Sequence, residues 1–393
     1  MSELALFGGT PVISGPLPPY RAMGPTEKAA VAEVMDSGCL SGFMGSPGPA
    51  FLGGPKVRAF EEAWAKHCGV KHAVSMNSAT SGLIAAMGAI ELRPGDEVIV
   101  PPWTMSATVA AVTARGGTPV FADIEAETFC IDPDEVRKKI TPRTRAIIAV
   151  NLFGHPAQLT RLRATADEHG IYLIEDSAQA PLAFDGDRRA GTVGDIGVFS
   201  FNYHKHIHTG EGGMCVTNDS VLAERMRLIR NHGENLGGLT GFNFRLTEIQ
   251  AAIGLVQLDR IEEHVGRREA LAGALTKTVW HEIGVHYPRL DPPRVLHHGF
   301  RSNYYLWAFQ YHGNAERFSA ALAAEGFPHT RGYVKPLYRL PAFRRGAITE
   351  VCRVAESLDD ILLFETCAYD VDDEMAAKLG ECLRKVYAQR GEL

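Results

Sequence analysis

The 393-residue chain lacks the features that mark membrane, secreted and nucleic-acid-binding proteins. No apolar run reaches the roughly 20 residues of a membrane-spanning helix. The N-terminus, M-S-E-L-A-L-F-G-G-T-P-V, has neither the basic start nor the long apolar stretch of a signal peptide, so we expect a cytoplasmic protein. The formal net charge is −6, whereas phosphate backbones require a basic face. We therefore expect neither a nucleic-acid partner nor a membrane partner.

Two further absences concern cysteine and nucleotide chemistry. The seven cysteines are scattered, odd in number and contain no C-x-x-C pair, so neither a disulfide framework nor a structural zinc site is indicated. Neither the Walker A spacing nor the glycine spacing of a dinucleotide fingerprint occurs, which removes the main sequence support for an ATPase or a Rossmann dehydrogenase. Hydrophobic content of 45% with 22% charged residues is typical of a soluble globular protein, and the length favours a large domain with a smaller partner.

Short β-rich runs alternate with stretches of helical period from about residue 70 to residue 220. The pattern predicts parallel strands joined by crossover helices, in an α/β fold of three layers with a mostly parallel sheet. The predicted strands are Glu97–Pro101, Pro119–Asp123, Arg145–Asn151 and Ile171–Glu175, and the predicted helices are Ser78–Ile90, Thr104–Arg115 and Leu159–His169. Functional groups on such a sheet lie at the carboxyl ends of the strands.

The C-terminal part predicts a smaller α+β domain. A long helix, Thr247–Val265, leads into it, so we expect a large domain over residues 1–265 and a small one over residues 266–393. The small domain's predicted elements are the aromatic strand Tyr304–Tyr311 and the helices Ala315–Glu325 and Asp372–Gln389. Glycine and proline interrupt any period in Gly332–Tyr338 and in Gly38–Pro55. The latter is either a binding loop or a disordered segment.

The most informative segment is Phe199–Gly213, which reads F-S-F-N-Y-H-K-H-I-H-T-G-E-G-G. Lys205 stands between the serine that ends an apolar run and a glycine-rich turn, although a lone lysine is normally a solvated surface charge. His204, His206 and His208 would share a face of a strand and could be metal ligands. No carboxylate cluster supports a metal site nearby in the sequence, so we expect no metal and interpret the histidines as polar lining of a site.

Two other segments give Lys205 a context. Asn77–Leu83 follows an apolar strand and opens a helix, where unpaired backbone N–H groups attract an anion; an ordinary helix cap by Ser78 or Thr80 is the alternative. Asp176 stands at the carboxyl end of another apolar strand, where a partly buried acid needs a cationic partner. A protonated pyridine nitrogen is one such partner, and a structural ion pair is the other interpretation.

A phosphate-binding helix start, a strand-end aspartate and a lysine before a glycine turn are the three groups that pyridoxal 5'-phosphate requires. The chain resembles the DegT/DnrJ/EryC1/StrS family of sugar aminotransferases, which are fold-type I pyridoxal phosphate enzymes. The resemblance covers nearly the whole chain. Its motifs are G-G-T-P-V near the start, Val57–Val70, Asp96–Pro102, E-D-S-A-Q-A, F-S-F…K…T-G-E-G-G, and Gly241–Ala252.

The resemblance implies a role for each matching residue. Lys205 would form the Schiff base and move the proton, and Asp176 would pair with the pyridinium nitrogen. The other implied cofactor contacts are Gln179 near the ring hydroxyl, Ser200, Thr80 and the Ala79 backbone at the phosphate, and Asn243 contributed by a neighbouring subunit. The protein would thus be a homodimer with shared active sites, passing through pyridoxamine 5'-phosphate during turnover.

Two positions depart from the family pattern. Ala79 stands where the family usually has glycine, a change that backbone amides tolerate. Met105 stands where an aromatic residue usually stacks on the pyridine ring, and its thioether can pack on such a face. Trp103 is an alternative source of the aromatic ring.

The resemblance therefore implies an aminotransferase that moves an amino group from glutamate or glutamine to a keto sugar, carried on a nucleotide, in amino-sugar biosynthesis. A keto-cyclitol (keto-inositol) acceptor is the alternative, followed by a sugar dehydratase that uses histidine in place of the lysine and by a non-catalytic cofactor-binding regulatory protein. The cations available for a diphosphate are Arg245, Arg331, Lys335 and Arg339, which could equally be surface charges.

Overall fold

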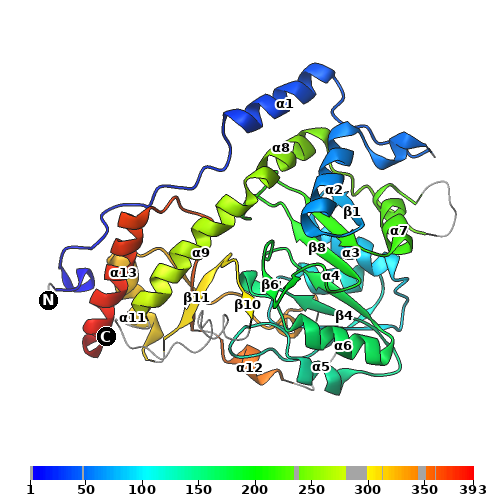
Figure 1. The fold of residues 1–393 in the computed structure, drawn as a ribbon. Helices are drawn as coiled ribbons and strands as arrows, with labels where there is room; N and C mark the ends of the chain where they lie inside the picture. The colour runs from blue at the N-terminus through cyan, green and yellow to red at the C-terminus, as the bar shows by residue number, and fades with distance from the viewer. Residues whose placement is uncertain are drawn as a thin grey trace.

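A seven-stranded sheet forms the core of the larger part of the molecule in the computed structural model, which describes residues 3–46, 48–233, 239–279, 299–311, 313–343, 351–358 and 360–393 (Figure 1). Its strand order is β1-β9-β8-β5-β4-β2-β3, and only β9 runs antiparallel to its neighbours. The strands are β1 (His72–Met76), β2 (Glu97–Val100), β3 (Thr118–Phe121), β4 (Thr144–Val150), β5 (Tyr172–Asp176), β8 (Ile196–Ser200) and β9 (Gly213–Thr217). The predicted mostly parallel sheet is confirmed.

Helices cover both faces of this sheet, because alternate strand residues point to opposite sides and both sets are apolar. One face packs on α3 (Ala79–Ala89), α4 (Ala107–Ala114) and α7 (Ser220–Arg230). The other face packs on α5 (Pro133–Lys139) and α6 (Leu159–His169) over part of its width, and on α2 (Pro55–Cys68) and α8 (Glu248–Asp259) over the rest. The three-layer α/β prediction is therefore correct.

The predicted helix over residues 247–265 is wrong in its extent. The structure has two helices, α8 and α9 (Ile261–Lys277), which meet at Arg260, where the backbone has φ −109° and ψ 4°. The apolar pattern continues through this break because both helices bury one face, so the pattern alone did not show it. The predicted helix over residues 104–115 begins only at Ala107, after an irregular segment that follows Pro101 and Pro102.

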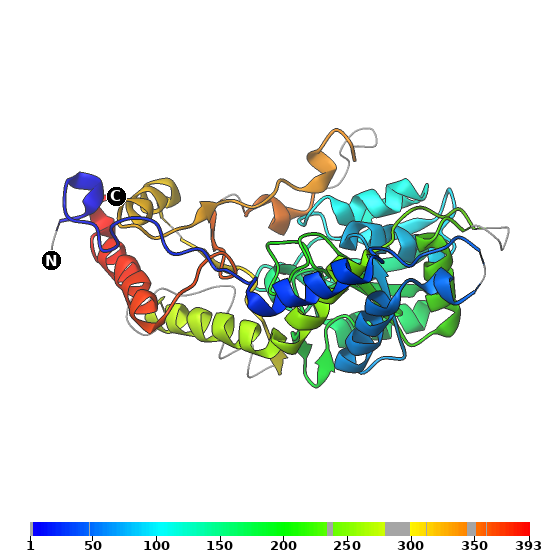
Figure 2. The ribbon, with the colours of Figure 1, turned by 90° about the horizontal axis from the view of Figure 1, so that it is seen from above.

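A second, antiparallel sheet lies toward one end of the elongated molecule, near both chain termini (Figure 2). Its strands are β11 (Trp307–Gln310), β13 (Ile361–Phe364) and β12 (Thr330–Arg331), accompanied by α11 (Ala315–Ala324) and α13 (Asp373–Ala388). Residue 265 lies inside α9, and the division into domains at that residue stays a prediction.

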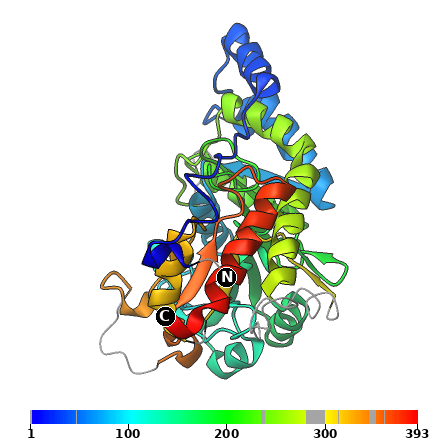
Figure 3. The same cartoon turned by 90° about the vertical axis from the view of Figure 1, so that its left-hand side faces the viewer.

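The N-terminal segment is bound to the C-terminal part of the chain. The backbone N–H groups of Ala5 and Val12 donate to the carboxylate of Glu325, at 2.8 Å and 3.0 Å. Lys385 Nζ also lies 2.8 Å from that carboxylate; the Glu325 side chain is fully buried, and 9% of the Lys385 side chain is exposed. The chain then crosses to α1 (Pro25–Ser37), which packs along α8 and projects from the body of the molecule (Figure 3).

The remaining elements are short. They are β6 (Phe184–Asp185), β7 (Arg188–Arg189), β10 (Phe300–Arg301), α12 (Arg353–Glu356) and 3₁₀ turns at Ala5–Phe7, Pro49–Leu52, Leu152–Gly154, Leu337–Arg339 and Arg390–Glu392. The predicted loop over residues 38–55 contains one such turn and the start of α2, and Pro47 lies outside the described residues. The predicted loop over residues 332–338 is irregular up to the turn that begins at Leu337. No helix within the described ranges is both long and apolar enough to cross a membrane.

Candidate active site

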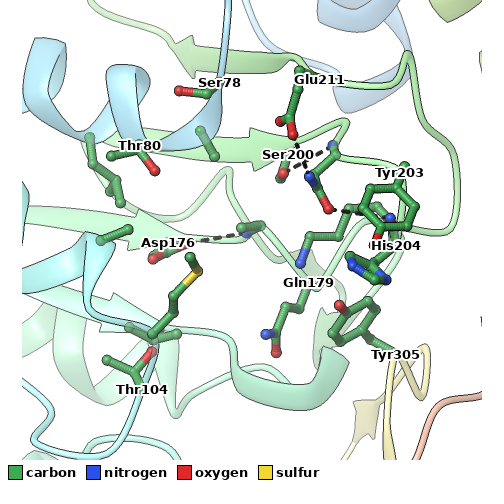
Figure 4. A pocket seen from close by; sticks show the side chains of 18 of the residues that line it. Ser78, Thr80, Thr104, Asp176, Gln179, Ser200, Tyr203, His204, Glu211 and Tyr305 are labelled. Carbon is green, nitrogen blue, oxygen red and sulfur yellow. Dashed lines mark hydrogen bonds between the residues drawn. The ribbon is translucent and has the colours of Figure 1, made fainter.

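A cavity of about 410 Å³ opens where the carboxyl ends of β4, β5 and β8 meet the start of α3. Most of the predicted site residues line it: Ala79, Thr80, Met105, Asp176, Gln179, Ser200 and Lys205. In Figure 4, Ser78 and Thr80 lie on one side of the cavity, while Tyr203, His204 and Tyr305 lie on the opposite side. Residues separated by more than a hundred positions in the sequence therefore share one cavity, at the edge of the sheet that the fold predicts.

The start of α3 offers backbone donors to this cavity. Ser78 is the N-cap, and its hydroxyl accepts a hydrogen bond from Ser81 N at 3.0 Å, so the capping interpretation is correct for Ser78. Capping and anion binding are compatible, because the first N–H groups of a helix have no partners within the helix. Gly213 brings β9 against this helix start. A Cβ at that position would lie 2.5 Å from the carbonyl carbon of Ser78 and 2.6 Å from Ala79 N.

Asp176 is the last residue of β5, and only 7% of its surface is exposed. Thr108 Oγ1 donates to its Oδ2 at 2.9 Å, and Ala178 N donates to its Oδ1 at 3.2 Å. Among the residues that the structure describes, no lysine, arginine or histidine lies within ion-pair distance of this carboxylate. Burial raises the pKa of Asp176, while Thr108, Ala178 and the more distant charge of Lys205 act against that rise.

Glu175 points to the other side of β5, as the alternation along a strand predicts. Its buried carboxylate accepts hydrogen bonds from the backbone N–H groups of Gly191, Val193 and Gly194 at 2.6 to 2.8 Å. Asn151 Nδ2 donates to the same carboxylate at 3.2 Å. Glu175 therefore fixes a loop and does not form a carboxylate pair with Asp176.

Lys205 lies in the turn that follows β8, where its backbone N–H donates to Asn202 O at 2.9 Å. Its Nζ is 4.2 Å from the centroid of the Tyr305 ring, and its side chain is partly exposed to the cavity. Burial lowers the pKa of Lys205 to about 8, although the negative charge of Asp176 favours the protonated form. An amine with this pKa has a substantial neutral fraction near neutral pH, which a nucleophilic lysine needs.

Gln179 and Ser200 are held by local hydrogen bonds beside the cavity. Gln179 Oε1 accepts from Phe153 N at 2.6 Å, and its Nε2 donates to Tyr333 Oη at 3.4 Å. Ser200 Oγ accepts from Asn202 N at 3.3 Å, at the carboxyl end of β8. Both side chains are thus oriented by the backbone of neighbouring segments.

The interpretation of the three histidines as site lining is correct only for His204. His206 is buried, and its Nδ1 lies 3.2 Å from Cys367 Sγ, while His208 also lies outside the cavity lining. Burial lowers the pKa of His206 to about 3. The segment forms a turn after Ser200 instead of a strand, so alternate residues do not share a face. Within the described parts of the chain, no group of three His, Cys, Asp or Glu side chains is arranged as metal ligands.

Met105 lines the cavity with 60% of its surface exposed, whereas Trp103 is 2% exposed. Trp103 packs in an aromatic cluster, with ring centroids 5.7 Å from Phe129, 5.7 Å from Phe153 and 5.3 Å from Tyr333. This packing fixes the indole away from the cavity lining. The alternative in which Trp103 supplies the ring over the cofactor is therefore wrong for this structure.

The aromatic rings of the cavity come instead from Tyr203, Tyr305 and Tyr333, which the sequence reasoning missed. Tyr203 belongs to the lysine segment itself, and its ring contacts His204 with centroids 3.7 Å apart. Tyr305 and Tyr333 lie in segments that were predicted only as a strand and a loop. Their position could not be read from the sequence because it depends on how the C-terminal part packs against the large sheet.

None of the four cations considered for a diphosphate lines the cavity. Arg331 lies 3.7 Å from a Glu316 oxygen, and Arg339 lies 2.6 Å from a Glu356 oxygen. Arg245 Nε donates to Asn243 Oδ1 at 2.9 Å. Three of the four thus have partners outside the cavity.

Asn243 is the predicted site residue that this chain does not bring into its own cavity. Its side chain is exposed, and its carbonyl oxygen accepts from Asn77 Nδ2 at 3.3 Å, directly before the residue that caps α3. The prediction that a neighbouring subunit contributes this residue stays a prediction.

Known proteins match this chain along most of its length. The model of the DegT/DnrJ/EryC1/StrS aminotransferase family matches residues 25–384. GDP-perosamine synthase of Caulobacter vibrioides is 41% identical over 252 residues, which cover 63% of this chain and 65% of that protein. The dTDP-3-amino-3,4,6-trideoxy-alpha-D-glucose transaminase of Streptomyces venezuelae is 38% identical over 297 residues, covering 70% of this chain and 76% of that one.

A solved structure agrees with both the fold and the family. The crystal structure of S. venezuelae DesV in complex with a ketimine intermediate superposes with a TM-score of 0.81 at 33% identity, and the match covers 92% of this chain and 94% of DesV. The predicted fold type is confirmed. The chain belongs to the DegT/DnrJ/EryC1/StrS aminotransferase family, as its motifs had indicated.

Proposed function

We propose that this protein is a pyridoxal phosphate-dependent aminotransferase that moves an amino group from glutamate or glutamine to a keto sugar carried on a nucleotide. The family and its solved relatives are pyridoxal phosphate-dependent aminotransferases. Two relatives, from Caulobacter vibrioides and Streptomyces venezuelae, are named for GDP-linked and dTDP-linked amino sugars. The product would be an intermediate of amino-sugar biosynthesis.

One observation carries the proposal: a buried carboxylate without a cationic partner and a lysine with a lowered pKa face the same cavity. A pyridinium nitrogen supplies the positive charge that Asp176 lacks within the described structure. The N–H groups at the start of α3, with Thr80 and the Ser200 hydroxyl, suit the phosphate. Met105 and the tyrosine rings supply apolar surface for the ring, so the residues present fit the cofactor.

When bound, the cofactor supplies a carbonyl carbon for amines to attack and an electron sink for the substrate carbon. Lys205 would hold that carbonyl end through Nζ, and its Nζ would take up and return a proton when it is free. A pKa of about 8 suits both transfers near neutral pH. Asp176 would keep the ring nitrogen protonated, and the face of Tyr305 would attract the protonated amine of Lys205. Gln179 would bind the ring hydroxyl.

A homodimer with shared active sites forms part of this proposal. The exposed side chain of Asn243 lies outside the cavity of its own chain and beside the segment that starts α3, which supports a role in the site of a second copy. Sedimentation of the cofactor-loaded protein measures the oligomeric state directly. A monomer that retains full activity would contradict both the homodimer and the role of Asn243.

Replacing Lys205 by alanine tests the catalytic assignment. Borohydride reduction of the loaded wild-type protein should attach the cofactor to Lys205, as peptide mass spectrometry would show, and Lys205→Ala should lose both the attachment and turnover. Lys71→Ala, which changes an exposed lysine, serves as the matched control and should behave as wild type. Attachment at a different lysine in the wild-type protein would refute the assignment.

A panel of nucleotide-linked 3-keto and 4-keto sugars and keto-inositols, each tested with glutamate and glutamine, identifies the substrate. Amination of a nucleotide-linked sugar supports the proposal, whereas the keto-cyclitol alternative is not favoured by the names of the relatives. Loss of water from the sugar would instead indicate the dehydratase alternative. If neither glutamate nor glutamine changed the absorbance of the bound cofactor, the non-catalytic alternative would be supported.

A further inference from the structure

We propose that Thr108 is a positioning residue for Asp176: its hydroxyl holds the carboxylate in one orientation and in the ionised form, so that the ring nitrogen of the bound cofactor stays protonated. This inference rests on the proposed function. Thr108 stands in the first turn of α4, and its surface is fully buried. It therefore reaches Asp176 from a helix, while Asp176 itself ends a strand.

The Asp176 carboxylate has one hydrogen-bond donor on each oxygen. The donor to Oδ2 is the Thr108 hydroxyl at 2.9 Å, and the donor to Oδ1 is the Ala178 N–H at 3.2 Å. Each oxygen keeps lone pairs for one further donor, such as a ring N–H. With a donor on each oxygen from two separate elements, the carboxylate cannot rotate without breaking a hydrogen bond.

Two threonines that lie later in their helices donate their hydroxyls to carbonyls of the same helix. Thr113, also on α4, donates to Val109 O at 3.4 Å and to Ala110 O at 3.0 Å. The buried Thr165 donates to Arg161 O at 3.0 Å, one turn earlier in α6. Thr108 stands in the first turn of α4, and its hydroxyl donates to Asp176 and not to a carbonyl of its own helix.

The ionisation of Asp176 depends on the groups that face its carboxylate, among them the Thr108 hydroxyl. Lys205 and Tyr333 face this carboxylate, and Glu175 lies on the opposite side of the strand among loop N–H groups. Burial raises the pKa of Asp176, and the hydrogen bond from Thr108 is the largest effect that opposes it. Removing that donor should raise the pKa further and favour the neutral acid, which cannot keep a pyridine nitrogen protonated.

The experiment compares Thr108→Val, Thr108→Ser and the control Thr113→Val in the cofactor-loaded protein. Pyridoxal phosphate labelled with ¹⁵N in its ring reports the protonation of that nitrogen through its NMR chemical shift over a pH series. We expect Thr108→Val to move the shift toward the unprotonated nitrogen and to lower kcat by roughly tenfold to hundredfold, as loss of a hydrogen bond to a charged group implies. Thr108→Ser should retain both properties, and Thr113→Val should match wild type.

An unchanged ¹⁵N shift in Thr108→Val would overturn the inference, even if kcat fell. If Thr108→Val does not fold, as judged by circular dichroism and thermal unfolding, Thr108→Ala replaces it, because it only removes atoms. Failure of the proposed function has a different signature, since the wild-type protein would then neither bind the cofactor covalently nor transfer an amino group. A wild-type protein that does both, beside a Thr108→Val variant with an unchanged shift, refutes the role of Thr108 alone.

Discussion

Replacing Gly213 by alanine should weaken cofactor binding by displacing the start of α3. Gly213 is the first residue of β9, where it pairs with Met76 on one side and with Ser200 on the other. An added Cβ would lie 2.5 Å from the carbonyl carbon of Ser78 and 2.6 Å from Ala79 N. Both of these atoms are backbone, so no side-chain rotation can relieve the contact.

The size of the effect follows from these distances. An ordinary contact begins at 3.4 Å, so β9 and the start of α3 must separate by about 0.9 Å. Overpacking of this kind costs about 1–3 kcal/mol of folding free energy. Moving the N–H groups proposed to bind the phosphate by that distance should break a hydrogen bond to a charged ligand, which corresponds to a roughly tenfold to hundredfold loss of affinity.

The assay is the dissociation constant of pyridoxal phosphate for the cofactor-free protein, measured together with unfolding in urea. Gly254→Ala is the matched control, because a Cβ there would lie 2.5 Å from the buried ring of Phe60, away from the cavity. Both variants should lose stability, and only Gly213→Ala should lose affinity. Equal dissociation constants for Gly213→Ala and wild type would refute the reasoning that this glycine sets the position of the phosphate site.

Three further predictions concern the pKa of Lys205, a buried ion pair and a helix. Because burial holds the pKa of Lys205 at about 8, the reaction of the cofactor-free protein with pyridoxal phosphate, followed by stopped flow, should accelerate as pH rises through 8. A rate-against-pH curve with its midpoint near the ~10.4 pKa of a free lysine would contradict this. Lys385→Met leaves the Glu325 carboxylate buried without its cation, so urea unfolding should show a loss of about 3 kcal/mol, with faster proteolysis of the N-terminal segment. Gly273→Ala in α9 places a Cβ in open space, so thermal unfolding should show a free energy of unfolding that is higher by about 0.5–1 kcal/mol. A lower stability of this variant would contradict a helical conformation at residue 273.

The large sheet could be predicted from the sequence because its strands are short apolar runs between helical periods. The predicted strand and helix bounds in this part mostly agree with the structure within one or two residues, except at the start of α4. The break between α8 and α9 could not be predicted, since both helices bury one apolar face and their patterns join at Arg260. Periodicity reports which side of a helix is buried, and it does not report a change of helix direction.

The same distinction applies to the site. Asp176 and Ser200 could be placed because parallel strands bring their carboxyl ends to one edge of a sheet. The prediction for His206 and His208 assumed a strand where the chain turns, so the side to which each points was wrong. Thr108 lies in the predicted helix Thr104–Arg115, yet its partner Asp176 lies 68 positions away, and nothing local to either residue indicates the hydrogen bond between them.

The cavity thus combines groups of two structural origins. The groups proposed to act on the cofactor lie at the carboxyl ends of the large sheet and at adjoining helix starts, whose positions are fixed by strand pairing and by contacts such as that of Gly213. Tyr305 and Tyr333 come instead from the C-terminal part of the chain, and the ring of Tyr333 packs against Trp103. Changes in how that part packs would alter the wall opposite the helix start while leaving Asp176 in place. Acceptor choice should therefore respond to substitutions at Tyr333 more than the reaction with the amino-acid donor does, whereas substitutions at Tyr305, whose ring lies against Lys205, should affect both reactions.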